Sequence, residues 1–307
     1  MDAAKVSLHE LLDIENPQAI LVEIEHIVSL LTREFDLAVL RQGYADIIRL
    51  FNGQFPGYQA SNTAYHDLSH TTLVALAMSR LMHGLAVDGH RFTGREILLG
   101  IMTALFHDTG LIQAVDDTVG TGAKYTIGHE ERSIARLRSY LATHDFTAAE
   151  IEEGASIIRC TVLNNSIAGM QFPSAIAELL GKILGSADLL AQMADRKYLE
   201  KLPLLFQEFE EAGIPGYKSE LELLKKTEQF YRSVAQTKLS KDFDNVAAAL
   251  RLHFRERWGA DRDLYAEAIA VNIKHLGAIG EVCREQYECY LDSLRRGGII
   301  SELIKKK

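Results

Sequence analysis

The feature of this sequence that most restricts its fold is the spacing of its apolar residues, which recur every three to four positions along most of the chain. The stretch NPQAILVEIEHIVSLLTREFDLAVLRQGYADIIRLF, residues 16–51, has this spacing over two or three predicted helices. Such spacing gathers apolar side chains on one face of an α-helix, whereas a half-buried strand alternates apolar and polar residues. The sequence contains neither convincing alternation nor an internal repeat. We therefore expect an all-α fold.

Two stretches interrupt the helical pattern. Residues 52–65, NGQFPGYQASNTAY, are rich in Gly, Asn, Ser and Pro and predict a loop, after which a helix resumes near His66. Residues 108–128, DTGLIQAVDDTVGTGAKYTIG, contain four glycines and little periodicity, which predicts an ordered surface loop with a function. Two later helix starts have the spacing of capping boxes, Thr93 with Glu96 and Thr147 with Glu150.

The formal net charge of -9 argues against one class of partner. A chain without a positive field has little to hold a nucleic-acid polymer, although a small anion held by metal ions remains compatible with it. The first residues, MDAAKVSLHELLDIENPQ, lack the pattern of a signal peptide, and no run reaches the roughly 20 apolar residues of a membrane span. We expect a cytoplasmic protein that acts on a small molecule and has no membrane partner.

The three cysteines, Cys160, Cys283 and Cys289, include no CxxC pair. The six-residue separation of Cys283 and Cys289 suits neither a zinc knuckle nor a redox pair. We expect all three to be reduced thiols inside the helical core.

Histidines and acids stand at the ends or on the apolar faces of several predicted helices. They come from the segments YHDLSH, FHD, GHEERS and SADLL. The four-residue spacing of His66 and His70 in the first segment predicts that both face one side of a helix. Taken singly, each residue can be a core histidine or a capping acid. A metal site, however, needs donors from several helices, and the ordered combination of these residues in apolar sequence predicts one. The members of the set are His66, His70, His107, Asp108, His129 and Asp188.

The order of these residues resembles the HD-domain superfamily of metal-dependent phosphohydrolases. Within it, YHDLSHTTLVALAMSRLM resembles the YHN..H..DV segment of class I cyclic-nucleotide phosphodiesterases, and LGIMTALFHDTG resembles their second metal motif. IIRCTVL stands where they have I.ATDM, and KILGSADLL is similar to their K.ADIS segment. The resemblance covers about residues 60–235. It implies a metal-binding core of residues 59–240 between N-terminal helices, 1–58, and C-terminal helices, 241–307, in one compact unit.

The resemblance also implies a role for each donor. His70, His107, Asp108 and Asp188 would hold a first metal, and this mixture of nitrogen and oxygen ligands suits zinc, manganese or iron. Asp108 would also contact a second metal, magnesium or manganese, and a hydroxide bridging the two ions would attack phosphorus. His66, near the metals without being a ligand, would protonate the leaving alkoxide.

Two positions depart from the phosphodiesterase pattern. Those enzymes read HD..H, whereas Leu111 stands here in place of the next histidine. His129 stands near a glutamate of those enzymes, and HEERSIARL resembles instead the H...G...L element of bacterial HD domains. We interpret His129 as a ligand of the second metal or as a residue that hydrogen-bonds to such a ligand.

Substrate-binding candidates come from a later segment and from the loop. TEQFYRSVA offers Gln229 and Phe230 near the place where the phosphodiesterases use a Gln and a Phe to hold the base, although an aromatic residue at helical spacing is equally a core residue. Lys124 and Arg132 can meet a phosphate or belong to a solvated face.

The leading interpretation is a phosphodiesterase that acts on a cyclic nucleotide or another small nucleotide. One alternative is an HD-type phosphomonoesterase, for example a nucleotidase. Another is an HD-like module that senses a ligand without turnover, although a degenerate site would be expected to have lost one of its metal ligands. The predicted C-terminal helices are apolar and could bury a dimer interface, so the sequence is compatible with a homodimer.

Overall fold

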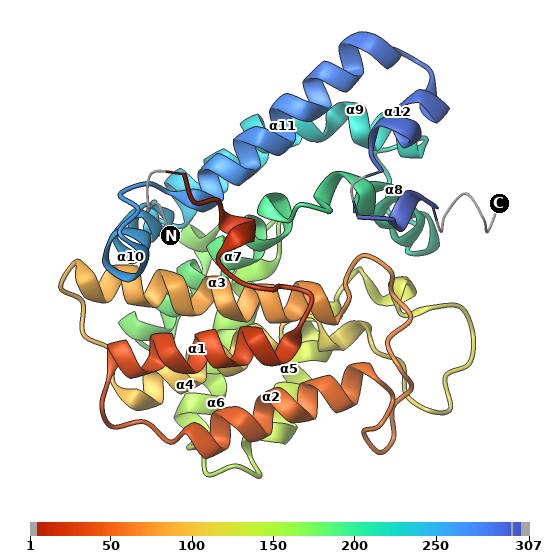
Figure 1. Cartoon of the computed structure of the whole chain (residues 1–307). Helices are drawn as coiled ribbons and strands as arrows, with labels where there is room; N and C mark the ends of the chain where they lie inside the picture. The colour runs from red at the N-terminus through yellow and green to blue at the C-terminus, as the bar shows by residue number, and fades with distance from the viewer. Residues whose placement is uncertain (1–4, 296, 302–307) are drawn as a thin grey trace.

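The computed structural model of the protein describes residues 5–295 and 297–301. Residue 296 and the outermost parts of the expected terminal regions, residues 1–4 and 302–307, lie outside the described residues. Throughout the described part the chain folds into helices, and extended pairing is limited to two isolated bridges (Figure 1). The prediction of an all-α, multi-helix fold is confirmed.

The described α-helices are joined by connections of varied length, of which the one between α4 and α5 is the longest. They are α1 (Pro17–Leu31), α2 (Leu37–Phe51), α3 (Leu68–Val87), α4 (Gly94–Phe106), α5 (His129–Leu141), α6 (Ala148–Ile158), α7 (Ala175–Ala194), α8 (Tyr198–Glu211), α9 (Glu220–Phe230), α10 (Ala249–Trp258), α11 (Leu264–Cys283) and α12 (Tyr287–Ser293). Two 3-10 turns, η2 (Thr109–Leu111) and η3 (Gly122–Tyr125), lie in the long loop, and two π-helical segments, η6 (Tyr231–Ala235) and η7 (Lys238–Asp242), follow α9.

Helix α3 lies at the centre of the bundle because its sequence offers no polar face to solvent. Every residue from His70 to Gly84 is buried, as expected for a helix that is apolar around most of its circumference. α3 packs against α1, α4, α7 and α10, and Figure 1 shows α1 running beside it. Gly84 permits the close approach of α10, since a Cβ there would lie 2.0 Å from the carbonyl oxygen of Ala249. The core therefore holds the first turn of α3 in a fixed place.

The helix starts agree with most of the capping signals. Both predicted capping boxes, at Thr93 and at Thr147, are present. α3, however, begins at Leu68, because the side chain of Asp67 caps it by accepting the backbone N–H of His70. The prediction that His66 and His70 lie on one face of the same helix is wrong, since His66 precedes the helix.

The prediction for two of the cysteines is also wrong. Cys283 and Cys289 form a disulfide, while Cys160 is a buried free thiol. α11 ends at Cys283, and the chain then turns through Arg284, which has a φ of 50°. This reversal brings the Cα atoms of the two cysteines to 5.4 Å, a separation that suits a disulfide.

Within the described residues, no helix is both long enough and apolar enough to cross a membrane.

Candidate metal centre

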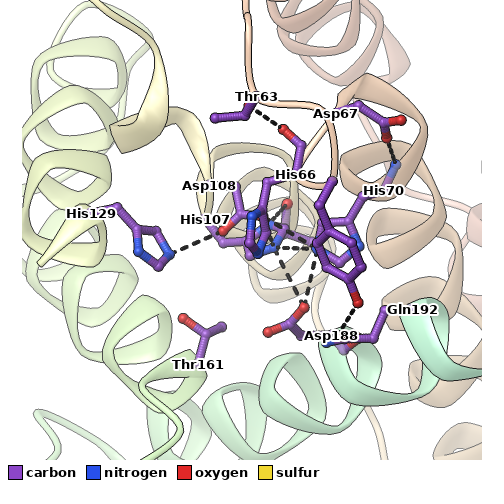
Figure 2. Close-up of polar contacts among 12 residues, drawn as sticks. Thr63, His66, Asp67, His70, His107, Asp108, His129, Thr161, Asp188 and Gln192 are labelled. Atoms are coloured by element: carbon purple, nitrogen blue, oxygen red, sulfur yellow. Dashed lines mark hydrogen bonds and ion pairs between the residues drawn. The ribbon is translucent and has the colours of Figure 1, made fainter. Parts of the chain in front are cut away.

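Four of the predicted ligands come together from three helices of the core (Figure 2). His70 lies in the first turn of α3, and Asp188 lies within α7. α4 ends at Phe106, and His107 and Asp108 follow it directly. The apolar helix α4 is buried from Ile97 onwards, so its end delivers this histidine and aspartate into the interior.

The donor atoms of these residues are closely spaced. His70 Nε2 lies 3.2 Å from Asp108 Oδ2 and 3.2 Å from Asp188 Oδ1. His107 Nε2 lies 3.2 Å from Asp108 Oδ2, 3.8 Å from Asp188 Oδ1 and 3.4 Å from His70 Nε2. Because metal ligands sit about 2.0–2.2 Å from a zinc ion, neighbouring donors are separated by distances of this size. His70, His107 and Asp108, which are all buried, form a group that could hold a metal ion.

Backbone contacts fix the orientation of two imidazoles. His107 Nδ1 lies 2.7 Å from the carbonyl oxygen of Ala104, and His129 Nδ1 lies 2.8 Å from that of Thr126. A carbonyl oxygen only accepts hydrogen bonds, so each Nδ1 carries the proton. In the neutral tautomer each Nε2 then presents a lone pair to Asp108, as expected of a metal-ligating histidine.

Asp108 is the residue that the imidazoles of His70, His107 and His129 share. Its Oδ2 atom is buried and has no hydrogen-bond partner among the described residues. Leaving a buried charged oxygen in this state costs several kcal/mol unless a cation compensates it. A metal ion between Oδ2 and the two Nε2 atoms would supply that compensation, and the donor set fits such an ion.

The protonation equilibria of the centre indicate the same need for positive charge. Burial would raise the pKa of Asp108, but the neighbouring imidazoles of His107, His129 and His70 hold that pKa well below its usual range. Burial would lower the pKa of His70, but Asp108 and Asp188 raise it to about 10. The pKa of His129 is likewise raised to about 9 against its burial, mainly by the hydrogen bond with Asp108. Protons or a divalent cation can provide the charge that these acids attract.

His129 approaches the centre from the opposite side of Asp108. Its Nε2 atom lies 3.2 Å from Asp108 Oδ1, whereas His70 and His107 face Oδ2. Asp108 therefore presents one oxygen to His70 and His107 and the other oxygen to His129 (Figure 2). This arrangement fits both interpretations of His129, as a ligand of a second ion and as a support for Asp108.

Two glycines fix the position of His129. Gly128 has a φ of 85°, a left-handed conformation that lets the loop turn directly into α5. Gly110 packs so closely under the start of α5 that a Cβ there would lie 1.9 Å from the carbonyl oxygen of His129. Leu111 is buried in the same 3-10 turn, η2, as Gly110.

The structure adds Glu208 to the predicted residues. Its Oε2 atom lies 2.6 Å from His66 Nδ1, and its Oε1 atom accepts the backbone N–H of Tyr65 at 2.7 Å. Glu208 is 4 % exposed although it is charged. The sequence signal was an acid in the apolar stretch LPLLFQEF, but Glu210 and Glu211 follow it closely, and nothing in the sequence indicates which of the three acids is buried.

A cavity of about 720 Å³ opens beside these donors. His66, Asp108, His129 and Asp188 line one end of it, whereas His70 and His107 lie beneath the wall. Phe230, the aromatic residue of the predicted substrate-binding pair, also lines the cavity.

Gln229, the other predicted base-binding residue, does not reach the cavity. Thr227 and Phe230 of α9 face the cavity, and Gln229 points about 100° away from Phe230 because an α-helix has 3.6 residues per turn. Gln229 is exposed to solvent. The assignment of Gln229 to substrate binding therefore has no support from the cavity lining.

Lys124 in the loop and Arg132 in α5 also have partners away from the cavity. Lys124 donates to Asp117 Oδ1 at 2.5 Å. Arg132 donates to the carbonyl oxygen of Gly110 at 2.7 Å and stacks 3.5 Å from the ring centroid of Tyr125. Both side chains stabilise the loop, and neither lines the cavity.

Comparison with known proteins assigns the chain to a family. Residues 16–249, more than half of the sequence, match the Npun_R2479-like family. The chain belongs to that family. No curated protein and no solved structure matches it. The part of this Npun_R2479-like chain that matches includes every donor of the centre together with Glu208, and it ends before α11 and α12.

Proposed function

We propose that this Npun_R2479-like chain is a metal-dependent hydrolase of phosphoesters. The observation that carries the proposal is the buried, unpartnered Oδ2 of Asp108 facing the Nε2 atoms of His70 and His107. The resemblance of these residues and Asp188 to the HD-domain superfamily supports the same conclusion.

His70, His107, Asp108 and Asp188 would hold the first metal. Their two nitrogens and two oxygens suit zinc, manganese or iron, and the Oδ1 atom of Asp108 with His129 would serve a second ion such as magnesium or manganese. When bound, divalent ions of this kind acidify water and neutralise the charge on phosphoryl oxygens.

Hydrolysis forms a bond from a water oxygen to phosphorus and breaks the bond from phosphorus to the alcohol oxygen, which leaves with a proton. His66 is the residue that would deliver this proton. Its side chain is 16 % exposed at the end of the cavity, and the contact of Nδ1 with Glu208 orients the ring. Nε2 is then the nitrogen that remains for the leaving group.

The charge of the cavity favours diesters over monoesters. A phosphomonoester carries up to two negative charges and a diester carries one. Lys238 is the one lysine or arginine among the described residues that line the cavity, and its Nζ atom lies 3.0 Å from the carboxylate of Asp242. We therefore propose a phosphodiesterase in preference to the phosphomonoesterase.

Two chromogenic esters test this proposal. The protein loaded with Mn²⁺ should hydrolyse bis-p-nitrophenyl phosphate faster than p-nitrophenyl phosphate. The reverse order would favour the monoesterase. Failure on both esters by protein that retains the metal would contradict either enzyme, and protein that binds no metal would favour the sensing module.

A further inference from the structure

The cavity beside the metal centre has one charged end and a long apolar remainder. It extends between α7, α8 and α9 as far as Phe243, which precedes α10. Leu202, Leu205 and Phe209 lie on one face of α8, three to four residues apart. Leu223, Thr227, Phe230 and Val234 have the same spacing along α9 and the π-helical segment η6. Two largely apolar helix faces therefore line the space.

Three of the polar side chains on these walls are already engaged within the protein. Thr227 Oγ1 donates to the carbonyl oxygen of Leu223 at 2.9 Å, and Thr161 Oγ1 donates to that of Ile158 at 2.9 Å. Lys238 donates to the carbonyl oxygen of Asn165 besides its contact with Asp242. These groups are not arranged to read the edge of a nucleobase or the hydroxyls of a sugar.

Gln192, the amide nearest the donors, is engaged as well. Its Oε1 atom accepts the hydroxyl of Tyr65 at 2.7 Å, and its Nε2 atom donates to the carbonyl oxygen of Asp188 at 3.3 Å. Specific recognition of a polar ligand needs buried polar groups that the ligand can satisfy. Beyond the metal end, the cavity offers mainly apolar surface, although Asn164, Tyr198 and Tyr217 also line it.

The cavity also carries apolar residues in contact with solvent. Ile127 is 70 % exposed and Leu163 is 38 % exposed, and both line the cavity. Ile127 comes from the glycine-rich loop just before α5, and Leu163 follows α6. Large apolar side chains left partly in water beside a cavity are typical of sites that bind apolar ligands.

We propose that the phosphoester substrate carries an extended apolar group, such as a long alkyl chain, which occupies the cavity between α8 and α9 while the phosphate lies at the Asp108 centre. This inference rests on the proposed hydrolase function and narrows its substrate class. It directs the search away from the small nucleotides that the sequence suggested.

A series of p-nitrophenyl alkyl phosphates tests the substrate class with the full chain and Mn²⁺. The kcat/KM value should rise at least about tenfold from the methyl through the butyl to the octyl ester, because each methylene that becomes buried is worth about fourfold in affinity. Binding of methyl-, butyl- and octylphosphonate, measured by calorimetry, should show Kd falling along the same series.

Substitutions in the wall locate the effect. Val234→Trp should reduce the ratio of kcat/KM for the octyl ester to that for the methyl ester, because the indole fills the apolar part of the cavity. Leu205→Trp, on the facing helix α8, is the second variant if Val234→Trp does not fold. The matched control is Val271→Trp, at a 59 % exposed position on α11 outside the cavity, which should leave the ratio unchanged.

The outcomes separate the substrate class from the hydrolase function. Hydrolysis that is equally fast along the series would overturn the apolar substrate and leave the hydrolase standing. If metal-loaded protein cleaves none of the esters, the proposed hydrolase function is wrong. The binding of the alkylphosphonates then tests the apolar site alone, and a Kd that is constant along the series would overturn it as well. Folded wall variants that keep the full octyl preference would also contradict the proposal.

Discussion

The imidazole of His66 is held by a carboxylate from helix α8. His66 Nδ1 lies 2.6 Å from Glu208 Oε2, although the two residues are 142 positions apart in the sequence. Glu208 is fixed in turn by the backbone N–H of Tyr65, which donates to its other oxygen. His66 precedes α3 and Glu208 lies near the end of α8, so the pair joins the two sides of the cavity.

This pair predicts how Glu208→Gln affects turnover. Losing the orienting carboxylate should lower kcat about 10- to 100-fold for esters with alkyl leaving groups, because general acid catalysis typically contributes about 10²–10⁴-fold. Esters with a p-nitrophenolate leaving group need little protonation and should be affected much less. Steady-state kinetics on both ester types measures the difference, and elemental analysis should find unchanged metal content. Glu210→Gln, at an exposed position of the same helix, is the control, and equal losses on both ester types would contradict the assignment.

Asp108→Ala should remove metal and activity together. Asp108 contacts His70 and His107 through Oδ2 and His129 through Oδ1. Mn²⁺ at 100 times its Kd should stabilise the wild type by about 2.7 kcal/mol, and this stabilisation should vanish in the variant. Denaturant unfolding with and without Mn²⁺ measures it. Asp116→Ala, an exposed acid in the same loop, should keep the full effect. Activity retained in Asp108→Ala would refute the mechanism.

Gly110→Ala should disturb the centre through the backbone. The added Cβ would overlap the carbonyl oxygen of His129, so the start of α5 must shift at a cost of about 1–3 kcal/mol in the free energy of unfolding. Gly277→Ala provides the comparison, since a Cβ there meets nothing within 4 Å and should stabilise α11 by up to about 1 kcal/mol. Equal effects of the two substitutions on unfolding and metal affinity would show that Gly110 has no special role.

A buried pair of histidines, His83 and His253, predicts how the free energy of unfolding changes at acidic pH. His253 is buried with its Nδ1 atom 3.1 Å from His83 Nδ1, and burial, followed by the charges of Arg80 and His83, holds the pKa of His253 well below 6.5. The unfolded chain therefore binds this proton first as the pH falls. The stability that neutral His253 contributes is complete above about pH 6.5 and is lost below it, by about 1.4 kcal/mol per pH unit.

Chemical denaturation between pH 6.5 and 5.5, with chelator present to remove any contribution from metal binding, measures this loss. In that range His70 and His129, whose pKa values are raised, are protonated in the folded chain and become protonated in the unfolded chain as well, so they add little pH dependence toward its lower end. His253→Gln should have a shallower dependence of its unfolding free energy on pH. A variant with the same slope as the wild type would exclude His253 as the group responsible.

The sequence predicts those parts of the structure that depend on local pattern. The period of the apolar residues is sufficient for the all-α fold, and the apolar segments around His70, His107 and Asp108 indicate that these polar residues are buried. Asp188 is only partly buried. Buried donors without local partners must meet one another, which is why these residues could be grouped before their geometry was known.

Features that depend on distant packing escape such prediction. Glu208 is one of several acids at the end of α8, and its burial depends on where Tyr65 and His66 lie. Gln229 and Phe230 are neighbours in sequence, yet the rotation of α9 places only Phe230 at the cavity. The contact between Cys283 and Cys289 depends on the chain reversal after α11, which their spacing does not reveal.

The most direct test of the central claim is a crystal structure of the protein grown with Mn²⁺, with anomalous diffraction data. The account predicts an anomalous peak within bonding distance of His70 Nε2, His107 Nε2 and Asp108 Oδ2, on the side of Asp188. A map from Mn²⁺-saturated crystals with no peak between these atoms, or with manganese bound only elsewhere, would contradict it.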